Sequence, residues 1–87
     1  MVMKNFMEEV VVDELEGVLN VIEGACKCEL CREDMVAWTL NRIDPLYVVR
    51  SMGRIYSKLE QVKYQQQATI TALLTKAAQV VKDNPRH

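Results

Sequence analysis

Residues 26–31 read Cys-Lys-Cys-Glu-Leu-Cys and hold all three cysteines of this 87-residue chain. A CxC step and a CxxC step therefore overlap within one hexapeptide. Zinc prefers four soft or borderline ligands in a tetrahedron, and closely spaced thiolates on a turn that enters a helix can converge on one ion. The helix amino terminus also favours their negative charge. We therefore predict a structural zinc site held by Cys26, Cys28 and Cys31.

The fourth ligand of this site is left open by the sequence. The candidates are Asp34 or Glu33, a water molecule, or a group from another subunit, whereas His87 is a poor candidate because it ends the chain. A redox or thiol-reactive role, or cysteines without any function, are the alternatives to a metal site. A catalytic zinc would also use three protein ligands and water. With no histidine near the cysteines in sequence and no other assembled acid–base set, we expect no enzyme.

Helical patterns lie on both sides of the cysteine segment. From Met3 to Ile22 apolar residues recur at helical spacing, and Gly24 supplies a stop signal. From about Glu29 a second helix is expected to run through Ile43 and to end before Pro45. The apolar positions of the first helix are Phe6, Val10, Leu15, Val18, Leu19 and Ile22.

The remaining third of the chain predicts one long helix after Gly53. Residues 47–52 before it are either a short helix or an extended piece. The apolar seam of the long helix has a 4-3-4-3-4 spacing that is interrupted by two polar residues, and such a thin stripe needs a partner. The seam consists of Ile55, Leu59, Val62, Gln66, Thr69 and Leu73, followed less regularly by Ala77 and Val80.

These elements predict an all-α fold, packed as a dimer, with an N-terminal helix, a Cys-rich turn, a second helix and a long C-terminal helix. We expect one domain over residues 1–87, with a motif-bearing region at 1–53, the long helix at 54–83 and a frayed tail at 84–87. A chain of this length has a modest core, so a metal or a second subunit is expected to add stability.

The charge of the chain is unevenly distributed. Residues 1–31 carry two lysines and seven carboxylates, a sum of −5, and the remainder sums to +4, for a net charge of −1. We therefore expect no direct nucleic-acid binding, and either packing of the acidic first helix near basic segments or a local anion site. No stretch resembles a membrane span or a signal peptide, which predicts a cytoplasmic protein.

Arginines and tyrosines gather in the middle of the chain and are candidates for binding an anionic ligand. Guanidinium groups bind phosphates bidentately, and aromatic rings stack on bases. A solvated basic face that pairs with the acidic first helix is the alternative. The candidate ligand-binding residues are Arg42, Tyr47, Arg50 and Arg54.

Three blocks of sequence together resemble the late competence protein ComFB family. They are Asn-Phe-Met-Glu-Glu-Val-Val at residues 5–11, Cys-Lys-Cys-Glu-Leu-Cys-Arg-Glu-Asp-Met-Val-Ala at 26–37 and Leu-Asn-Arg-Ile-Asp-Pro-Leu-Tyr-Val at 40–48. Their order and spacing match, and the resemblance covers residues 3 to about 53. By this resemblance Cys26, Cys28 and Cys31 would be the metal ligands.

The resemblance implies a small, mainly helical, homodimeric bacterial protein with cysteine-bound zinc. Some members of the family are linked to DNA-uptake competence, and cyanobacterial relatives are receptors for cyclic dinucleotides. We therefore expect a zinc-stabilised homodimeric regulatory or adaptor protein that binds cyclic di-GMP or cyclic di-AMP, a protein partner of the DNA-uptake or signalling machinery, or both. The alternative is a structural interaction module that uses the long helix and binds no small molecule.

Overall fold

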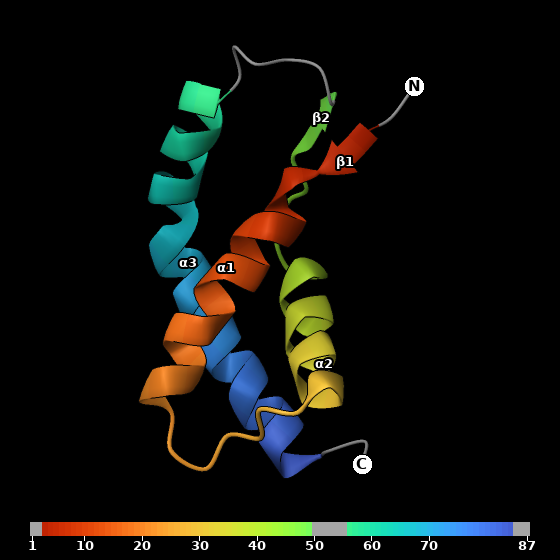
Figure 1. The fold of residues 1–87 in the computed structure, drawn as a ribbon, viewed down its shortest axis with the longest axis vertical. Coiled ribbons are helices and arrows are strands. Elements are labelled where there is room, and N and C mark those ends of the chain that lie inside the picture. The colour runs from red at the N-terminus through yellow and green to blue at the C-terminus, as the bar shows by residue number, and fades with distance from the viewer. Residues whose placement is uncertain (1–2, 50–55, 85–87) are drawn as a thin grey trace.

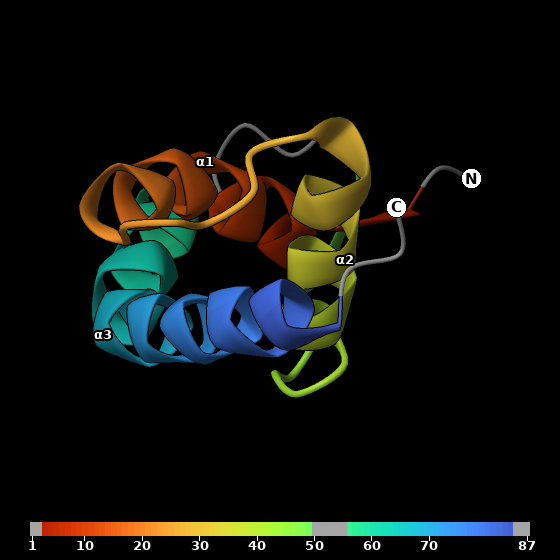
Figure 2. The same cartoon turned by 90° about the horizontal axis from the view of Figure 1, so that it is seen from below.

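The fold consists of three helices and one two-stranded sheet. A computed structural model describes residues 3–49 and 56–84, with the backbone alone for residues 49 and 56–59. The helices surround one apolar core, and the strands pair beside the start of α1 (Figures 1 and 2). None of the helices in these two ranges has the length and apolar character that crossing a membrane requires. The elements are β1 (Met3–Asn5), α1 (Phe6–Val21), α2 (Glu29–Leu40), β2 (Tyr47–Val49) and α3 (Tyr56–Asp83).

Helix α1 forms where the apolar spacing predicts a helix. Asn5 caps it, with an extended backbone and a side-chain oxygen that accepts a hydrogen bond from the Met7 N–H at 3.2 Å. The β-prone valines at 10–12 are helical as predicted, because the helix buries Val10 and Val11 in the core. Each such buried side chain contributes about 1.5–3 kcal/mol. The buried face comprises Met7, Val10, Val11, Leu15, Val18 and Leu19.

The sheet is absent from the all-α prediction, which is therefore correct only for the helices. Residues 3–5, expected to begin the first helix, form β1 and pair antiparallel with β2, with Met3 opposite Val49 and Asn5 opposite Tyr47. The alternatives for residues 47–52 are thereby decided for 47–49, which are extended. Residues 50–52 lie outside the described residues.

Asn5 also connects α1 to the segment before β2. Its side-chain oxygen accepts a second hydrogen bond, from the Leu46 N–H at 2.9 Å, and the Phe6 N–H donates to the Leu46 carbonyl at 2.7 Å. The Asn5–Leu46 bond joins residues 41 positions apart. A pattern of neighbouring residues cannot reveal such pairing, which explains why β1 and the sheet were not predicted.

Helix α2 is shorter than predicted. Its buried face is Cys31, Met35 and Thr39, spaced four residues apart. The prediction that it continues through Ile43 is wrong, because the chain tightens after Leu40: the Arg42 N–H donates to the Thr39 carbonyl at 3.0 Å. Pro45 therefore follows a turn rather than the helix itself.

Helix α3 packs against both α1 and α2. Of the described side chains of the predicted seam, only Ala77 is buried, and the other residues that α3 buries are neighbours of the seam along the helix. Gln66 and Thr69 are exposed, and Val62 and Leu73 are half-buried. Ile55 and the Leu59 side chain lie outside the described part. The residues of α3 in the core are Ile70, Leu74, Ala77, Ala78 and Val81.

Candidate metal centre

A loop between α1 and α2 carries the first part of the cysteine segment. The loop turns at Gly24, whose φ of +78° lies in the left-handed region that glycine adopts without strain. A Cβ atom at this position would lie 3.1 Å from Nζ of Lys82 in the last turn of α3. The loop therefore passes close to the end of α3, and it continues into the half-buried Ala25 and Cys26.

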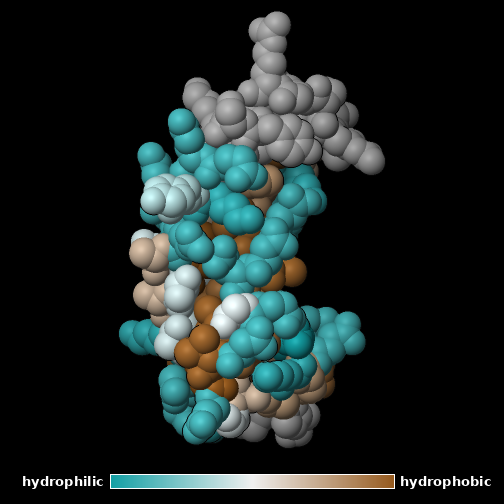
Figure 3. All heavy atoms as spheres, turned by 60° about the vertical axis from the view of Figure 1, so that its left-hand side comes forward, coloured by the Kyte–Doolittle hydropathy of each residue, from teal (hydrophilic) through white to brown (hydrophobic). Residues whose placement is uncertain are grey.

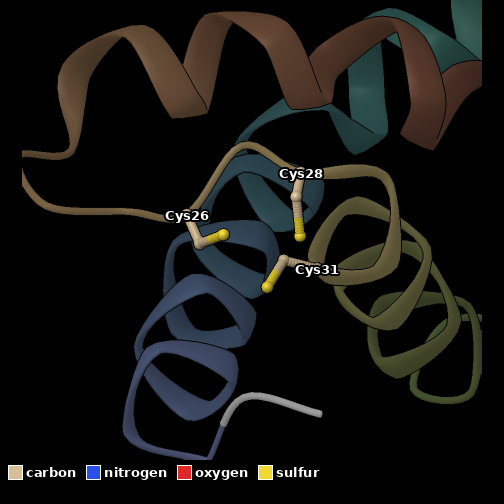
Figure 4. A group of neighbouring side chains, drawn as sticks. All are labelled: Cys26, Cys28 and Cys31. Atoms are coloured by element: carbon tan, nitrogen blue, oxygen red, sulfur yellow. The ribbon is translucent and has the colours of Figure 1, made fainter. Parts of the chain in front are cut away.

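The three cysteines converge from the loop and from the start of α2. Cys26 lies in the loop, Cys28 is the N-cap of α2, and Cys31 lies in its first turn. Their sulfur atoms point toward one another (Figure 4) and all lie within 4.8 Å of one another. Zinc–sulfur bonds of about 2.3 Å in a tetrahedron require sulfur–sulfur separations of roughly 3.8 Å. Only a small contraction of the cluster would therefore be needed to enclose one ion.

The surroundings of Cys28 and Cys31 shift the pKa values of their thiols in opposite directions. Hydrogen bonding from the Cys31 backbone N–H lowers the pKa of the Cys28 thiol, and the Cys26 side chain lowers it further. Burial, with added effects of the Cys26 and Cys28 side chains, raises the pKa of Cys31 to about 12. None of the three forms a disulfide. A bound metal would stabilise the thiolate of Cys31, which burial alone disfavours.

The donor set fits zinc, and the fourth ligand stays open. Glu33 is exposed, and Asp34 is half-buried outside the cluster that the three thiols form. His87 lies outside the described residues. In the described ranges this cluster is also the one group of three or more His, Cys, Asp or Glu residues close enough to hold a metal ion.

Arg32 also supports this centre, a role that no sequence pattern predicts. Its Nε donates to the Lys27 carbonyl at 2.8 Å, and its guanidinium also pairs with the Glu16 carboxylate of α1. Arg32 therefore connects the loop between Cys26 and Cys28 to both helices. Its position directly after Cys31 was the available signal.

Comparison with known proteins supports the family resemblance over nearly the whole chain. The family model described as "Late competence development protein ComFB" matches residues 4–85. The chain belongs to the ComFB family. Competence protein ComFB of Bacillus subtilis (strain 168) is 31% identical over 81 residues, which cover 93% of this chain and 83% of that protein. The solved structure of the late competence protein ComFB from Bacillus subtilis matches with a TM-score of 0.80 and 30% identity, over 97% of this chain and 92% of that one.

Two of the predicted ligand-binding residues of this ComFB-family chain, Arg42 and Tyr47, lie in the described part, in the segment that follows α2. The Arg42 side chain is exposed and stacks on Trp38, with 3.6 Å between its guanidinium carbon and the ring centroid. Its Nη1 also donates to the Trp38 carbonyl at 2.8 Å. Tyr47 in β2 is 59% exposed. Arg50 and Arg54 lie outside the described residues.

A cavity of about 310 Å³ lies beside Arg42, between the start of α1, the segment after α2 and the first half of α3. Arg42 and Asp44 give it one cationic and one anionic side chain. Tyr47 does not line it, so the structure brings only one of the described candidates to this cavity. Its lining residues are Met7, Arg42, Ile43, Asp44, Pro45, Leu46, Val62, Gln66 and Thr69.

Proposed function

We propose that this ComFB-family chain is a zinc-stabilised, non-enzymatic regulatory or adaptor protein that acts in DNA-uptake competence. The observation that carries the proposal is the convergence of three thiols within 4.8 Å at the junction of α1 and α2. Zinc bound there would supply structural cross-linking. Cys26, Cys28 and Cys31 would hold the ion, and Arg32 would orient the loop.

The burial of Cys31 agrees with a structural role better than with a catalytic role, whereas Cys26 is half-buried and Cys28 is exposed. Cys31 is fully buried and belongs to the same core as Met35, Ala78 and Val81. A catalytic zinc needs an open coordination position that substrate can reach. The burial of Cys31 instead favours a clamp that ties the core of α2 and α3 to the loop after α1.

We further propose that the chain is a homodimer in which α3 contributes to the interface. Among the described side chains of residues 60–69, none is buried, and Tyr64 is 81% exposed. Val62 and Leu73 of the predicted seam are half-buried, and Val80 is 38% exposed. On the side of the molecule that carries this helix, apolar atoms are visible between polar side chains (Figure 3). A second copy would cover them.

The ligand of the regulatory protein would be cyclic di-GMP or cyclic di-AMP. Support comes from the cavity beside Arg42 and from the Arg42–Trp38 stack, which holds the guanidinium in a fixed orientation. A guanidinium can bind a phosphate bidentately. The cavity volume is at the small end of the range for ligand sites, about 300–1,000 Å³. Arg50 and Arg54 lie outside the described residues and are candidates from the sequence alone.

Calorimetric titration with each cyclic dinucleotide at moderate salt tests this ligand. We expect saturable binding that Arg42→Ala, Arg50→Ala and Arg54→Ala each weaken about tenfold, the effect of losing a charge-assisted hydrogen bond. Lys76→Ala, which removes an exposed cation from α3, is the matched control and should leave affinity unchanged. An absence of heat for both nucleotides would contradict the receptor role.

Such an absence would favour the second candidate function, a structural interaction module without a small ligand. The exposed first half of α3 is the specific observation that supports it. In that case Tyr64→Lys should weaken self-association or partner binding, measured by native mass or co-purification. Neither nucleotide should give heat of binding in calorimetry. Loss of transformability on deletion of the gene in its host would test the competence role under either candidate.

A further inference from the structure

An open apolar groove runs between α1 and α2. We call it the α1–α2 groove; its volume is about 560 Å³. No cysteine lines it, but Arg32 on its rim also binds the Lys27 carbonyl of the cysteine segment. The groove shares no lining residue with the cavity at Arg42. Val12 is 52% exposed on the α1 side, while Val36 and Leu40 are half-buried on the α2 side. Its apolar floor is formed by Val12, Leu15, Val36, Ala37 and Leu40, and its charged rim by Asp13, Glu16, Glu29, Arg32 and Glu33.

The rim of the α1–α2 groove is acidic. Four carboxylates face one guanidinium, which leaves three negative charges in excess. Arg32 is already engaged by Glu16, and Asp13 lies 3.8 Å from Lys63. Glu29 and Glu33 form no ion pair with another described residue and are exposed. A neighbouring hollow along α1 shares Val12 and Asp13 with the groove and is also lined by Lys4, Glu8 and Glu9. Lys4 pairs with Glu9, so Glu8 and Asp13 are the carboxylates in excess there.

This charge excludes some occupants and favours another. A phosphate-bearing ligand would be repelled by the rim, so the α1–α2 groove is not a second site for an anionic nucleotide. An occupant with an apolar face and flanking cations would fill the floor and also neutralise Glu29 and Glu33. A basic amphipathic helix has this combination of properties.

The geometry favours a helix over an extended segment. Helix α3 already packs against both α1 and α2 on one side of this pair (Figure 2). The floor of the groove offers residues of two adjacent helices on another side, at the spacing of 36, 37 and 40 on α2. Side chains at positions i, i+3, i+4 and i+7 of an incoming helix can occupy such a groove.

We propose that the α1–α2 groove docks a basic amphipathic helix of a partner protein. The inference deepens the adaptor part of the proposed function and rests on it, since it gives the adaptor a partner of defined chemistry. The inference does not depend on nucleotide binding beside Arg42. The cysteines lie at the start of α2, whereas Arg42 follows its C-terminal end.

A synthetic peptide tests the proposal with the zinc-loaded chain of 87 residues. The probe is a fluorescent amphipathic helix of about 18 residues, or five turns, with leucine on one face and lysine and glutamine on the other. A control peptide carries glutamate in place of every lysine. In anisotropy titrations at about 0.15 M salt, we expect saturable binding of the lysine peptide and at least about tenfold weaker binding of the glutamate peptide.

Two groove variants and two matched controls locate the binding. Glu29→Lys with Glu33→Lys should weaken binding of the lysine peptide about tenfold, and Ala37→Leu should weaken it by filling the floor. The controls are Glu23→Lys in the loop and Ala72→Leu on α3, which change exposed residues outside the groove and should leave binding unchanged. Circular dichroism checks that every variant is folded. Native mass checks that each variant still holds zinc, because Glu33 is a candidate fourth ligand and Glu29 lies between Cys28 and Cys31. The peptide pair tests charge selectivity without any variant.

Three binding results would each overturn the proposal. The first is that the lysine peptide shows no saturable binding. The second is that both peptides bind equally well, and the third is that the groove variants do not alter binding. A change of native mass in Ala37→Leu from dimer to monomer would also overturn the proposal, because a second copy of the chain would then occupy the groove. Calorimetry of the same variants with cyclic dinucleotides should be unchanged, so a failure here is distinguishable from failure of the receptor role.

Discussion

Arg32 illustrates how a single side chain supports the candidate metal centre from outside it. It binds the Lys27 carbonyl within the cysteine segment and pairs with Glu16 on α1. We predict that Arg32→Ala lowers zinc affinity about tenfold, the usual size of effect for a residue that orients metal ligands. Competition with a chromogenic chelator measures this affinity. Arg42→Ala, an exposed arginine outside the centre, is the control, and equal affinities of the Arg32 and Arg42 variants would contradict the positioning role.

Thr39 presents the opposite case, a polar group placed in the core. Thr39 is fully buried, and its hydroxyl has no hydrogen-bond partner among the described residues. Thr39→Val keeps the shape and removes the unpaired hydroxyl, so we expect stability to rise by about 1 kcal/mol, measured by urea unfolding. Thr75→Val is the matched control, because the exposed Thr75 hydroxyl donates to the Thr71 carbonyl. A destabilised Thr39→Val protein would show that the hydroxyl has a partner.

At the level of elements, local patterns predicted the three helices but not their exact limits or the sheet. The spacing of Phe6, Val10 and Leu15 marks α1 because the helix period is local. Strand β1 depends on pairing with residues more than 40 positions away, which no local period records. The spacing of the three cysteines alone predicted that their thiols cluster, as the structure shows. Arg32 was missed because its role comes from the Lys27 carbonyl and from Glu16 on another helix.

The face of α3 that packs in the core differs from the seam that the sequence predicts. A near-heptad beginning at Ile55 passes through Leu73, whereas the structure buries Leu74 completely and Leu73 only in part. Both stripes are apolar in the second half of α3. The sequence alone therefore did not identify which one faces α1 and α2.

Paired leucine substitutions test this assignment. Leu74→Ala should lower the free energy of unfolding by about 3 kcal/mol, since it opens a cavity in a close-packed core. Leu73→Ala should lower it by about 1 kcal/mol, because the side chain is only partly buried. Urea unfolding at two protein concentrations separates core packing from subunit association. The reverse order of the two effects would support the heptad seam as the core face instead.

For the whole molecule, the charge on the thiols couples metal binding to pH. Burial raises the pKa of Cys31 to about 12, so this thiol carries its proton at neutral pH in the metal-free protein. Metal binding must displace that proton, and protons therefore compete with the ion. We predict that apparent zinc affinity falls at least about tenfold for each unit of decreasing pH between 8 and 6. Competition titrations at three pH values measure the slope, and a flat profile would argue against ligation by Cys31.

The same proton has the opposite effect on the metal-free chain. Because the folded-state pKa of Cys31 lies above the unfolded value of 9.0, the protonated thiol favours the folded state below pH 9. That contribution is lost as pH rises from 9 toward 12. Between pH 6 and 8 the Cys31 thiol should therefore change the stability of the metal-loaded protein and leave that of the metal-free protein unaltered, whereas above pH 9 it should destabilise the metal-free fold. Urea unfolding of both forms across these two ranges measures the difference.

The central claim is that one zinc ion, held by Cys26, Cys28 and Cys31, stabilises the fold. The most direct measurement is native mass spectrometry for metal content, followed by thermal melting of the same sample before and after chelation. We predict one zinc ion per chain and a fall in Tm of at least about 10 °C once the metal is removed, since losing about 2 kcal/mol shifts a domain of this size by that much. A chain purified without metal that binds none on addition of zinc, or unchanged melting after verified removal, would contradict the account.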